Sequence, residues 1–316
     1  MADRSQIEHR WSCLAPAKGD ADESVDDGGF YRFGSFPSTA SRMRRFEAEA
    51  PDLAAEAVGR LRLDLDPRAP THLIIISCTG LSAPGLDFEL IERFGLSPSI
   101  ERTVVGFMGC YAAINGLKLA RHIVRSEPAA RVLLVSLELC TLHLQETTDL
   151  EQVLTFMIFG DGCAAALVSA ERSGFELDSF HAVLVPDTAA HITWTIRDSG
   201  FDMMLAGKVP GCIGDGLRAR GQDILQGRPV DQVDLWAVHP GGRSVLDAVE
   251  TALELPVPAM AASRQVLRDH GNMSSASILF VLKALLQEEP AGKNGCAMAF
   301  GPGLVAETML FSQARH

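Results

Sequence analysis

The chain has 316 residues, of which 47% are hydrophobic, so it can fill a large core in one duplicated domain or two separate ones. Its formal net charge of −12 argues against nucleic acid as a partner, because a phosphate backbone is bound through a basic surface. The N-terminus is charged, and no apolar run approaches the roughly 18 residues that a membrane span needs. We therefore expect a cytoplasmic protein that does not enter a membrane.

Strands and helices alternate along the chain. Residues 12–40 are rich in Gly, Pro, Ser and Asp, which predicts a long surface loop. Residues 43–63 carry apolar side chains at helical spacing, and we expect an interruption at Pro51. Apolar runs typical of buried strands lie at 73–77, 131–138 and 163–170, and again at 235–239, 296–300 and 305–311. This alternation predicts an α/β fold that is either five-layered or doubly wound.

Two stretches of the chain can be superimposed without a gap. An apolar run ends at Ser77 and another at His239, and a helical pattern follows each of them. The spacing to the polar residue before each helix is identical: 110 − 77 = 33 for Cys110, and 272 − 239 = 33 for Asn272. We therefore predict two halves of one duplicated fold, residues 1–170 with the cysteine and residues 171–316 with the histidine and the asparagine.

Cys110, His239 and Asn272 are the residue types that can form a thiolate, move a proton and hold an oxyanion. If Cys110 lies in the first turn of its helix, unpaired N–H groups and the macrodipole favour the thiolate. We therefore expect an acidic thiol that acts as a nucleophile near neutral pH. Asn272 and His239 would direct two donors into the same cavity.

Other interpretations remain open. A cysteine before an apolar helix is often a small core residue, and a histidine at a strand end is often only hydrogen-bonded. The cluster Arg42, Arg44 and Arg45 is typical of a solvated face, or it could bind a phosphorylated carrier. Papain-like hydrolases share the chain order Cys, His, Asn, but they lack an internal duplication. A catalytically silent dimeric scaffold is a further alternative, which the intact trio of residues disfavours.

Seven cysteines without a CxxC pair favour reduced thiols, and nine histidines show no metal-ligand spacing, so we expect no metal. Five short motifs occur in a specific order: GFMGCYAA around Cys110, FGDG at 159–162, VHPGG at 238–242, GNMSSA at 271–276 and FGPG at 300–303. With them the chain resembles bacterial type III polyketide synthases, the chalcone synthase-like family of the thiolase fold, from about Gln6 to Leu310. Ketoacyl synthases that initiate fatty acid synthesis share the Cys, His and Asn but differ in the flanking residues.

The resemblance implies a thiolase-like, duplicated α/β/α/β/α layered fold and a homodimer. It also implies that Cys110 takes an acyl group from an acyl-CoA starter. His239 and Asn272 would bind malonyl-CoA, whose decarboxylation gives the enolate for a Claisen condensation. Cyclisation would then give a pyrone or a small aromatic product. No cofactor is implied, because coenzyme A thioesters supply the activation.

The resemblance suggests further site residues as well. Phe175 is expected as a gatekeeper, and Thr148 and Ser274 as lining of the cavity. Trp194, Met203 and Ala83 depart from the plant pattern, in which a Gly, a Phe and a Met that reaches the partner subunit are typical. Family members normally carry a basic segment before the region matching IEHRW, so either the start is truncated or the carrier binds differently. The coenzyme A positions expected here are Arg4, Gly242 and Ser244.

Overall fold

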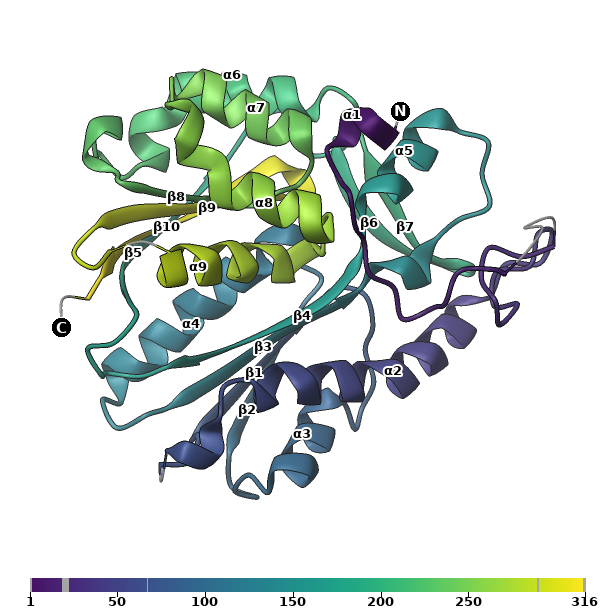
Figure 1. Cartoon of the computed structure of the whole chain (residues 1–316), viewed down its shortest axis with the longest axis horizontal. Helices are drawn as coiled ribbons and strands as arrows, with labels where there is room; N and C mark the ends of the chain where they lie inside the picture. The colour runs from purple at the N-terminus through teal and green to yellow at the C-terminus, as the bar shows by residue number, and fades with distance from the viewer. Residues whose placement is uncertain (1, 19–22, 67, 289, 315–316) are drawn as a thin grey trace.

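The computed structural model describes residues 2–18, 23–66, 68–288 and 290–314. Five layers follow one another in Figure 1: outer helices, a sheet, two central helices, a second sheet and a further layer of helices. The strand order is β2-β1-β3-β4 in the first sheet and β5-β10-β9-β8 in the second. Of the two arrangements predicted from the alternation of strands and helices, the five-layered one is therefore confirmed.

The first sheet contains β1 (His72–Ser77), β2 (Glu101–Gly106), β3 (Val132–Leu139) and β4 (Asp161–Val168). β1 is parallel to β2 and β3, whereas β4 is antiparallel to β3. Its outer face is covered by α2 (Thr39–Gly59) and α3 (Leu86–Phe94) and its inner face by α4 (Ala112–Ser126) and α9 (Ser277–Glu288). Helices on both faces explain why β1 and β3 are buried along their whole length.

The second sheet contains β5 (Phe175–Leu184), β8 (Leu235–Val238), β9 (Asn294–Gly301) and β10 (Val305–Gln313). Its outer layer consists of α6 (Val209–Ile224), α7 (Arg243–Ala252) and α8 (Ala261–His270). A hairpin of β6 (Ile192–Arg197) and β7 (Gly200–Leu205) lies to one side with α5 (Leu150–Ile158), and α1 (Ala2–Ser5) begins the chain. None of the described helices is both long and apolar enough to cross a membrane.

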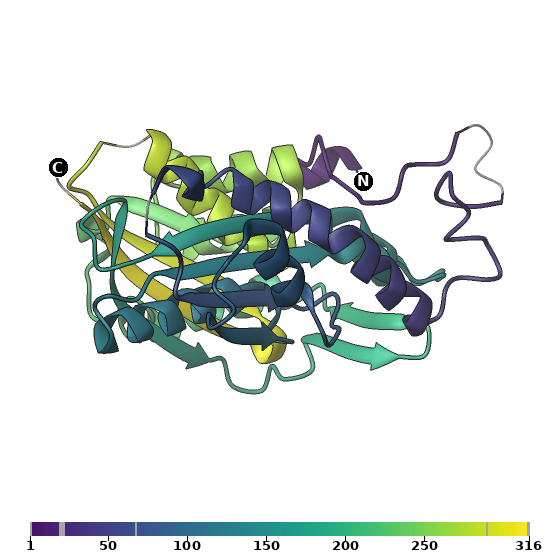
Figure 2. The ribbon, with the colours of Figure 1, turned by 90° about the horizontal axis from the view of Figure 1, so that it is seen from below.

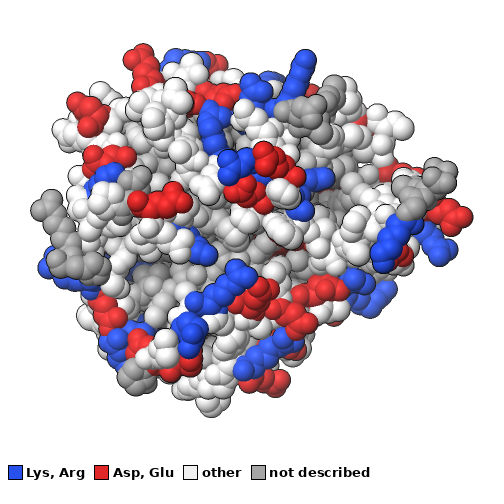
Figure 3. Space-filling model, in the orientation of Figure 1, with Lys and Arg blue, Asp and Glu red and all other residues white. Residues whose placement is uncertain are grey.

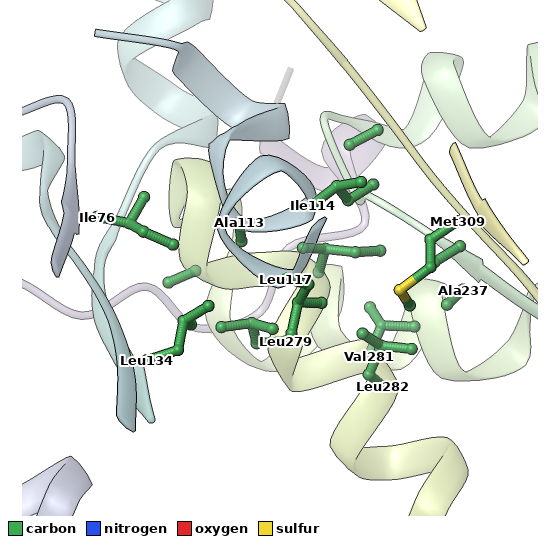
Figure 4. Packing of buried hydrophobic residues seen from close by; sticks show 14 of the residues in the cluster. Ile76, Ala113, Ile114, Leu117, Leu134, Ala237, Leu279, Val281, Leu282 and Met309 are labelled. Carbon is green, nitrogen blue, oxygen red and sulfur yellow. The ribbon is translucent and has the colours of Figure 1, made fainter. Parts of the chain in front are cut away.

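The core lies around the two central helices (Figure 4). Ile114 and Leu117 project from α4, and Leu279 and Leu282 from α9, into one buried cluster that includes side chains of both sheets. Burying a Leu or Ile side chain of this kind contributes about 1.5–3 kcal/mol. The apolar pattern of these two helices thus holds the two halves of the fold together.

One sequence offset relates the two halves in space. Ile74 pairs with Leu134 in the first sheet, and Trp236 pairs with Cys296 in the second; 236 − 74 = 162 and 296 − 134 = 162. The same offset separates Cys110 from Asn272, since 272 − 110 = 162. The register of the strands therefore confirms the duplicated fold.

Two expectations about the region before β1 need correction. The predicted interruption at Pro51 is wrong, because α2 continues through this residue and buries it against the first sheet. Figure 2 shows α2 lying along the outside of that sheet, with the coil that precedes it extending past the sheet's end. Arg42 is no part of a solvated face or a carrier site: it is fully buried and donates to the carbonyls of Pro37, Leu142 and Leu144.

Candidate active site

The N-terminal ends of α4 and α9 meet, and each is preceded by a single 3₁₀ turn. Cys110 lies in the turn Gly109–Tyr111, and Ser274 begins the turn Ser274–Ala276. The Cys110 Sγ is 3.8 Å from the Ser274 Oγ. Asn272 accepts a hydrogen bond from the Ser274 N–H at 2.8 Å through its Oδ1. The duplication thus brings the predicted cysteine and asparagine to one place.

The backbone at Cys110 requires glycine before it. Gly109 has a φ of +71°, and a Cβ atom there would lie 2.2 Å from the Cδ of Pro302. The Gly109 N–H donates to the Cys78 Sγ at 3.1 Å. The loop after β9 and the loop after β1 therefore fix the position of the thiol from two sides.

His239 follows β8 directly and is 1% exposed. Neither of its ring nitrogens has a hydrogen-bond partner within the described part of the chain. Burial lowers the pKa of His239 to about 3, so the ring is neutral at physiological pH. The loop that carries His239 contacts Asn272, because the Gly241 carbonyl accepts a hydrogen bond from the Asn272 Nδ2 at 3.3 Å. This part of the structure therefore contains a neutral imidazole whose two nitrogens have no partner among the described residues.

The expected acidic thiol is wrong for the site as the structure shows it. Burial raises the pKa of the Cys110 thiol to about 12, and the charge of Glu138 raises it further. Hydrogen bonds from Ser274 and Asn272 and the backbone at the helix start act in the opposite direction, but their effect on this pKa is smaller. The thiol is consequently protonated at neutral pH in this environment.

Sequence reasoning missed Glu138, a carboxyl group that is fully buried on β3. It accepts hydrogen bonds from the Cys78 N–H at 3.0 Å, from the Thr79 hydroxyl at 2.8 Å and from the Ser275 hydroxyl. Burial raises the pKa of Glu138 to about 7 despite these bonds. A glutamate inside a mostly apolar strand is rare, and this feature of the sequence could have identified Glu138.

A small cavity of about 40 Å³ opens beside the thiol. Three predicted residues, Trp194, Met203 and Ser274, line it together with Cys110. Trp194 is held in place because its Nε1 donates to the Cys78 carbonyl at 2.7 Å. The remaining lining residues are Cys78, Thr79, Gly109, Cys140, His143, Phe156, Phe159, Ile192 and Pro302. In its present shape the cavity has room for only a few water molecules.

Two expected cavity residues lie elsewhere. Phe175 packs on Phe311 with ring centroids 4.6 Å apart, and it does not line the cavity of Cys110. Thr148 is exposed in the coil before α5. Phe159 lines the cavity instead, and a β-bridge joins its backbone to that of Asn272. Phe159 belongs to the FGDG motif, so the motif contained the relevant aromatic residue.

The three expected carrier positions gather near the start of α7. Gly242 precedes this helix, Ser244 is exposed in its first turn, and Arg243 donates to the carbonyl of Arg4 at 3.3 Å. Ala83 is exposed in the loop between β1 and α3. Over the described residues, no group of three or more His, Cys, Asp or Glu side chains is arranged to hold a metal ion.

Two family models match the chain almost end to end. The N-terminal domain of chalcone and stilbene synthases matches residues 34–172, and the C-terminal domain of the same family matches residues 176–314. The chain belongs to the chalcone and stilbene synthase family. It is a type III polyketide synthase, an acyltransferase that acts on coenzyme A thioesters. This assignment excludes the papain-like alternative.

Named relatives agree with the family models. The chain is 35% identical over 305 residues to the alpha-pyrone synthesis polyketide synthase-like Pks18 of Mycobacterium tuberculosis, covering 92% of this chain and 78% of that protein. It is 34% identical over 309 residues to bisdemethoxycurcumin synthase of Oryza sativa, covering 89% and 75% respectively.

Solved structures confirm the thiolase-like fold of this polyketide synthase. The type III polyketide synthase domain of Steely1 from Dictyostelium superimposes with a TM-score of 0.88 at 26% identity, covering 99% of this chain and 88% of that one. PKS-I of the brown alga Ectocarpus siliculosus gives a TM-score of 0.86 at 32% identity, covering 98% and 87%.

The raised pKa of Cys110 predicts how its alkylation depends on pH. Iodoacetamide reacts with the thiolate, so the rate at Cys110 should still be rising at pH 10, above the ordinary cysteine pKa of about 8.5. Mass spectrometry of tryptic peptides after timed labelling measures this rate, with free cysteine as the reference. A plateau at Cys110 below pH 8 would show that the helix start outweighs burial.

Proposed function

We propose that Cys110 is the nucleophile of this polyketide synthase, that His239 is its base and that His239 and Asn272 stabilise the oxyanion. One observation supports this most strongly. The Cys110 thiol and the Asn272 amide lie together where the two central helices begin. Neutral His239, whose ring nitrogens have no hydrogen-bond partner among the described residues, lies two residues before Gly241, whose carbonyl accepts from that amide. Buried polar groups are normally paired, and a buried histidine whose nitrogens are both free is suited to bind a substrate.

In the loading step, His239 accepts the proton of the Cys110 thiol as the sulfur attacks the thioester carbonyl of the starter. The tetrahedral intermediate then releases coenzyme A, which takes the proton back from His239 and leaves the acyl group on Cys110. Because His239 is neutral and buried, its ring is available as a base over the physiological pH range.

In the extension step, the carbonyl oxygen of malonyl-CoA accepts hydrogen bonds from the Asn272 amide and from the N–H of neutral His239. These donors stabilise the enolate that forms as carbon dioxide leaves. The enolate carbon attacks the acyl-cysteine and displaces the Cys110 sulfur, which is then free to accept the lengthened chain. The desolvated environment strengthens each of these hydrogen bonds.

The division of roles is testable by substitution. Cys110→Ala should abolish acyl loading and chain extension but retain decarboxylation of malonyl-CoA, because enolate stabilisation does not require the thiol. Asn272→Ala should slow decarboxylation by roughly 10²- to 10³-fold, the usual effect of losing one oxyanion donor. Release of labelled carbon dioxide and mass spectrometry of the acyl-enzyme measure the two steps.

Asn294→Ala provides the matched control, because this asparagine is exposed at the start of β9, far from the thiol in sequence and fold. It should decarboxylate malonyl-CoA at the wild-type rate. An Asn272→Ala enzyme as active as this control would remove Asn272 from the proposed chemistry.

We propose further that the product is short, a small pyrone or a single aromatic ring. The indole of Trp194 and the side chain of Met203 lie directly opposite each other on β6 and β7, and both line the cavity. His143 supports the indole, with ring centroids 5.3 Å apart. A cavity this small leaves little space for a growing chain.

Trp194→Gly should therefore accept bulkier acyl-CoA starters or add further malonyl units. It should also destabilise the fold by about 3–5 kcal/mol, since it truncates a large, mostly buried ring. Met203→Ala serves as the comparison and should change product size less, because methionine already adapts its shape. Liquid chromatography and mass spectrometry of products from a series of starters test this. An unchanged starter range and chain length in folded Trp194→Gly would exclude the indole as the limiting wall.

We also propose that the enzyme is a homodimer. Support comes from β2, which forms one edge of the first sheet and leaves residues 101–104 exposed. Val104 is 53% exposed on this edge, which favours a subunit contact over a solvated surface.

Sedimentation velocity at micromolar concentration should show a dimer for the wild type. Val104→Lys should shift the equilibrium towards monomer, because a charge on the edge opposes pairing with a second sheet. Leu184→Lys is the control, since Leu184 is similarly exposed, on the second sheet. A wild-type monomer, or equal effects of the two lysines, would contradict this interface.

A further inference from the structure

The β6–β7 hairpin carries one wall of the cavity, although it belongs to neither of the two four-stranded sheets. Trp194 and Met203 lie opposite each other on it, and both line the cavity. The distance of this wall from the thiol therefore depends on the contacts that attach the hairpin to the rest of the molecule. One attachment is the hydrogen bond from the Trp194 Nε1 to the Cys78 carbonyl. A second one runs through His143.

His143 joins the hairpin to the loop after β1. It is buried at the end of the 3₁₀ turn Cys140–His143. Its Nε2 lies 2.7 Å from the Thr79 carbonyl oxygen, so this nitrogen carries a proton and donates it to the hydrogen bond. Its Nδ1 accepts from the Phe201 N–H at 3.0 Å. Only a neutral ring with its proton on Nε2 can make both bonds, and burial lowers the pKa of His143 to about 3, which keeps the ring in this form.

Ring contacts fix the orientation of the same imidazole. It stacks on Phe201 with ring centroids 4.2 Å apart and an angle of 12° between the planes, and the Trp194 indole meets it edge to face at 5.3 Å. Phe107, which precedes Cys110 by three residues, contacts the Phe201 ring at 5.3 Å. His143 thus lies between the indole that lines the cavity and a phenylalanine that contacts the segment leading to the thiol.

The turn that contains His143 is itself held by Arg42 of α2. On the face shown in Figure 3, Lys and Arg side chains lie at the surface, many of them beside Asp or Glu. Arg42 is fully buried instead, and it donates to the carbonyls of Leu142 and Leu144, the two neighbours of His143. A Cβ atom at Gly200, the first residue of β7, would lie 2.7 Å from the Arg42 Nε. Arg42 therefore fixes the turn and also packs against the hairpin.

We propose that His143 is a positioning residue: its two hydrogen bonds to the backbone hold the hairpin beside the thiol and so restrict the reaction to small acyl-CoA starters. Its role rests on the proposed function, in which Trp194 is the limiting wall. A phenylalanine ring would fill almost the same space, but it would leave the Thr79 carbonyl and the Phe201 N–H buried without a partner. Unpaired buried groups are costly, so the hairpin would separate from the loop until water reached them.

His143→Phe tests the proposal, because it keeps the ring and removes both hydrogen bonds. Alkylation of Cys110 by iodoacetamide and by the bulkier N-benzyliodoacetamide is followed by mass spectrometry of tryptic peptides. The ratio of the two rates reports access and is independent of the protonation of the thiol. It should rise by about tenfold or more in His143→Phe, the effect of two ordinary hydrogen bonds on a local opening. His143→Gln should give an intermediate ratio, because its amide can still donate to the Thr79 carbonyl.

His122→Phe is the matched control, since His122 is exposed on α4, and its ratio should equal that of the wild type. Starter preference is the second measurement. The kcat/KM for benzoyl-CoA relative to that for acetyl-CoA should rise in His143→Phe and stay unchanged in His122→Phe. Hydrogen exchange is the third, and it needs no variant: the Phe201 N–H should exchange slowly in the wild type, because His143 accepts from it.

Three results would overturn the proposal. The alkylation ratio is the same in His143→Phe and His122→Phe, so that the volume of the ring suffices; or the ratio rises while the starter preference does not; or the wild-type Phe201 amide exchanges as fast as in an unfolded peptide. Alkylation and exchange require no turnover, so they test His143 separately from the proposed chemistry. A wild type that does not decarboxylate malonyl-CoA would contradict the roles of His239 and Asn272 instead.

Discussion

The structure depends on the burial of two helices between two sheets. α4 and α9 each present apolar side chains in several directions, and this is possible only because another helix and a sheet lie on their sides (Figure 4). Their positions are equivalent by the duplication, so their N-terminal ends reach the same region. Residues that come just before either helix therefore lie in the same small region, and Cys110 and Asn272 are two such residues.

The same burial determines the electrostatics of the site. Desolvation favours the neutral forms, which raises the pKa of Cys110 to about 12 and lowers that of His239 to about 3. A thiolate–imidazolium pair is therefore not the resting form. In the proposed mechanism the proton leaves the thiol while the carbon–sulfur bond forms, when the developing oxyanion and its donors compensate for the charge on His239. In that mechanism, burial of the site postpones the formation of charge until a thioester is present.

Sequence patterns predicted the layers and the duplication because these depend on local periodicity and on a fixed spacing, and the same spacing singled out Cys110 and Asn272. The exact ends of the helices were harder to predict from the sequence. α9 begins at Ser277, five residues after Asn272 (277 − 272 = 5), because a 3₁₀ turn intervenes. The pKa of Cys110 could not be predicted, because burial depends on side chains from both halves. Phe175 was misassigned for a related reason, because a cavity is lined by segments that are distant in sequence. The β-bridge between Phe159 and Asn272, which the sequence does not reveal, shows that Phe159 is the phenylalanine next to Asn272.

The duplication also explains how two copies of the same backbone fold carry different functional groups at equivalent positions. At the offset of 162, Ser77 corresponds to His239, and Cys110 to Asn272. Glu138, the buried carboxyl group of the first half, corresponds to the apolar Phe300, since 300 − 138 = 162. The two members of each pair occupy equivalent positions, one in each half. A substitution in one half therefore changes the chemistry of the site without altering the backbone of the other half. The proposed nucleophile and the buried acid belong to the first copy, and the proposed base and amide donor belong to the second. Cys110 and Asn272 come together because the two central helices begin side by side.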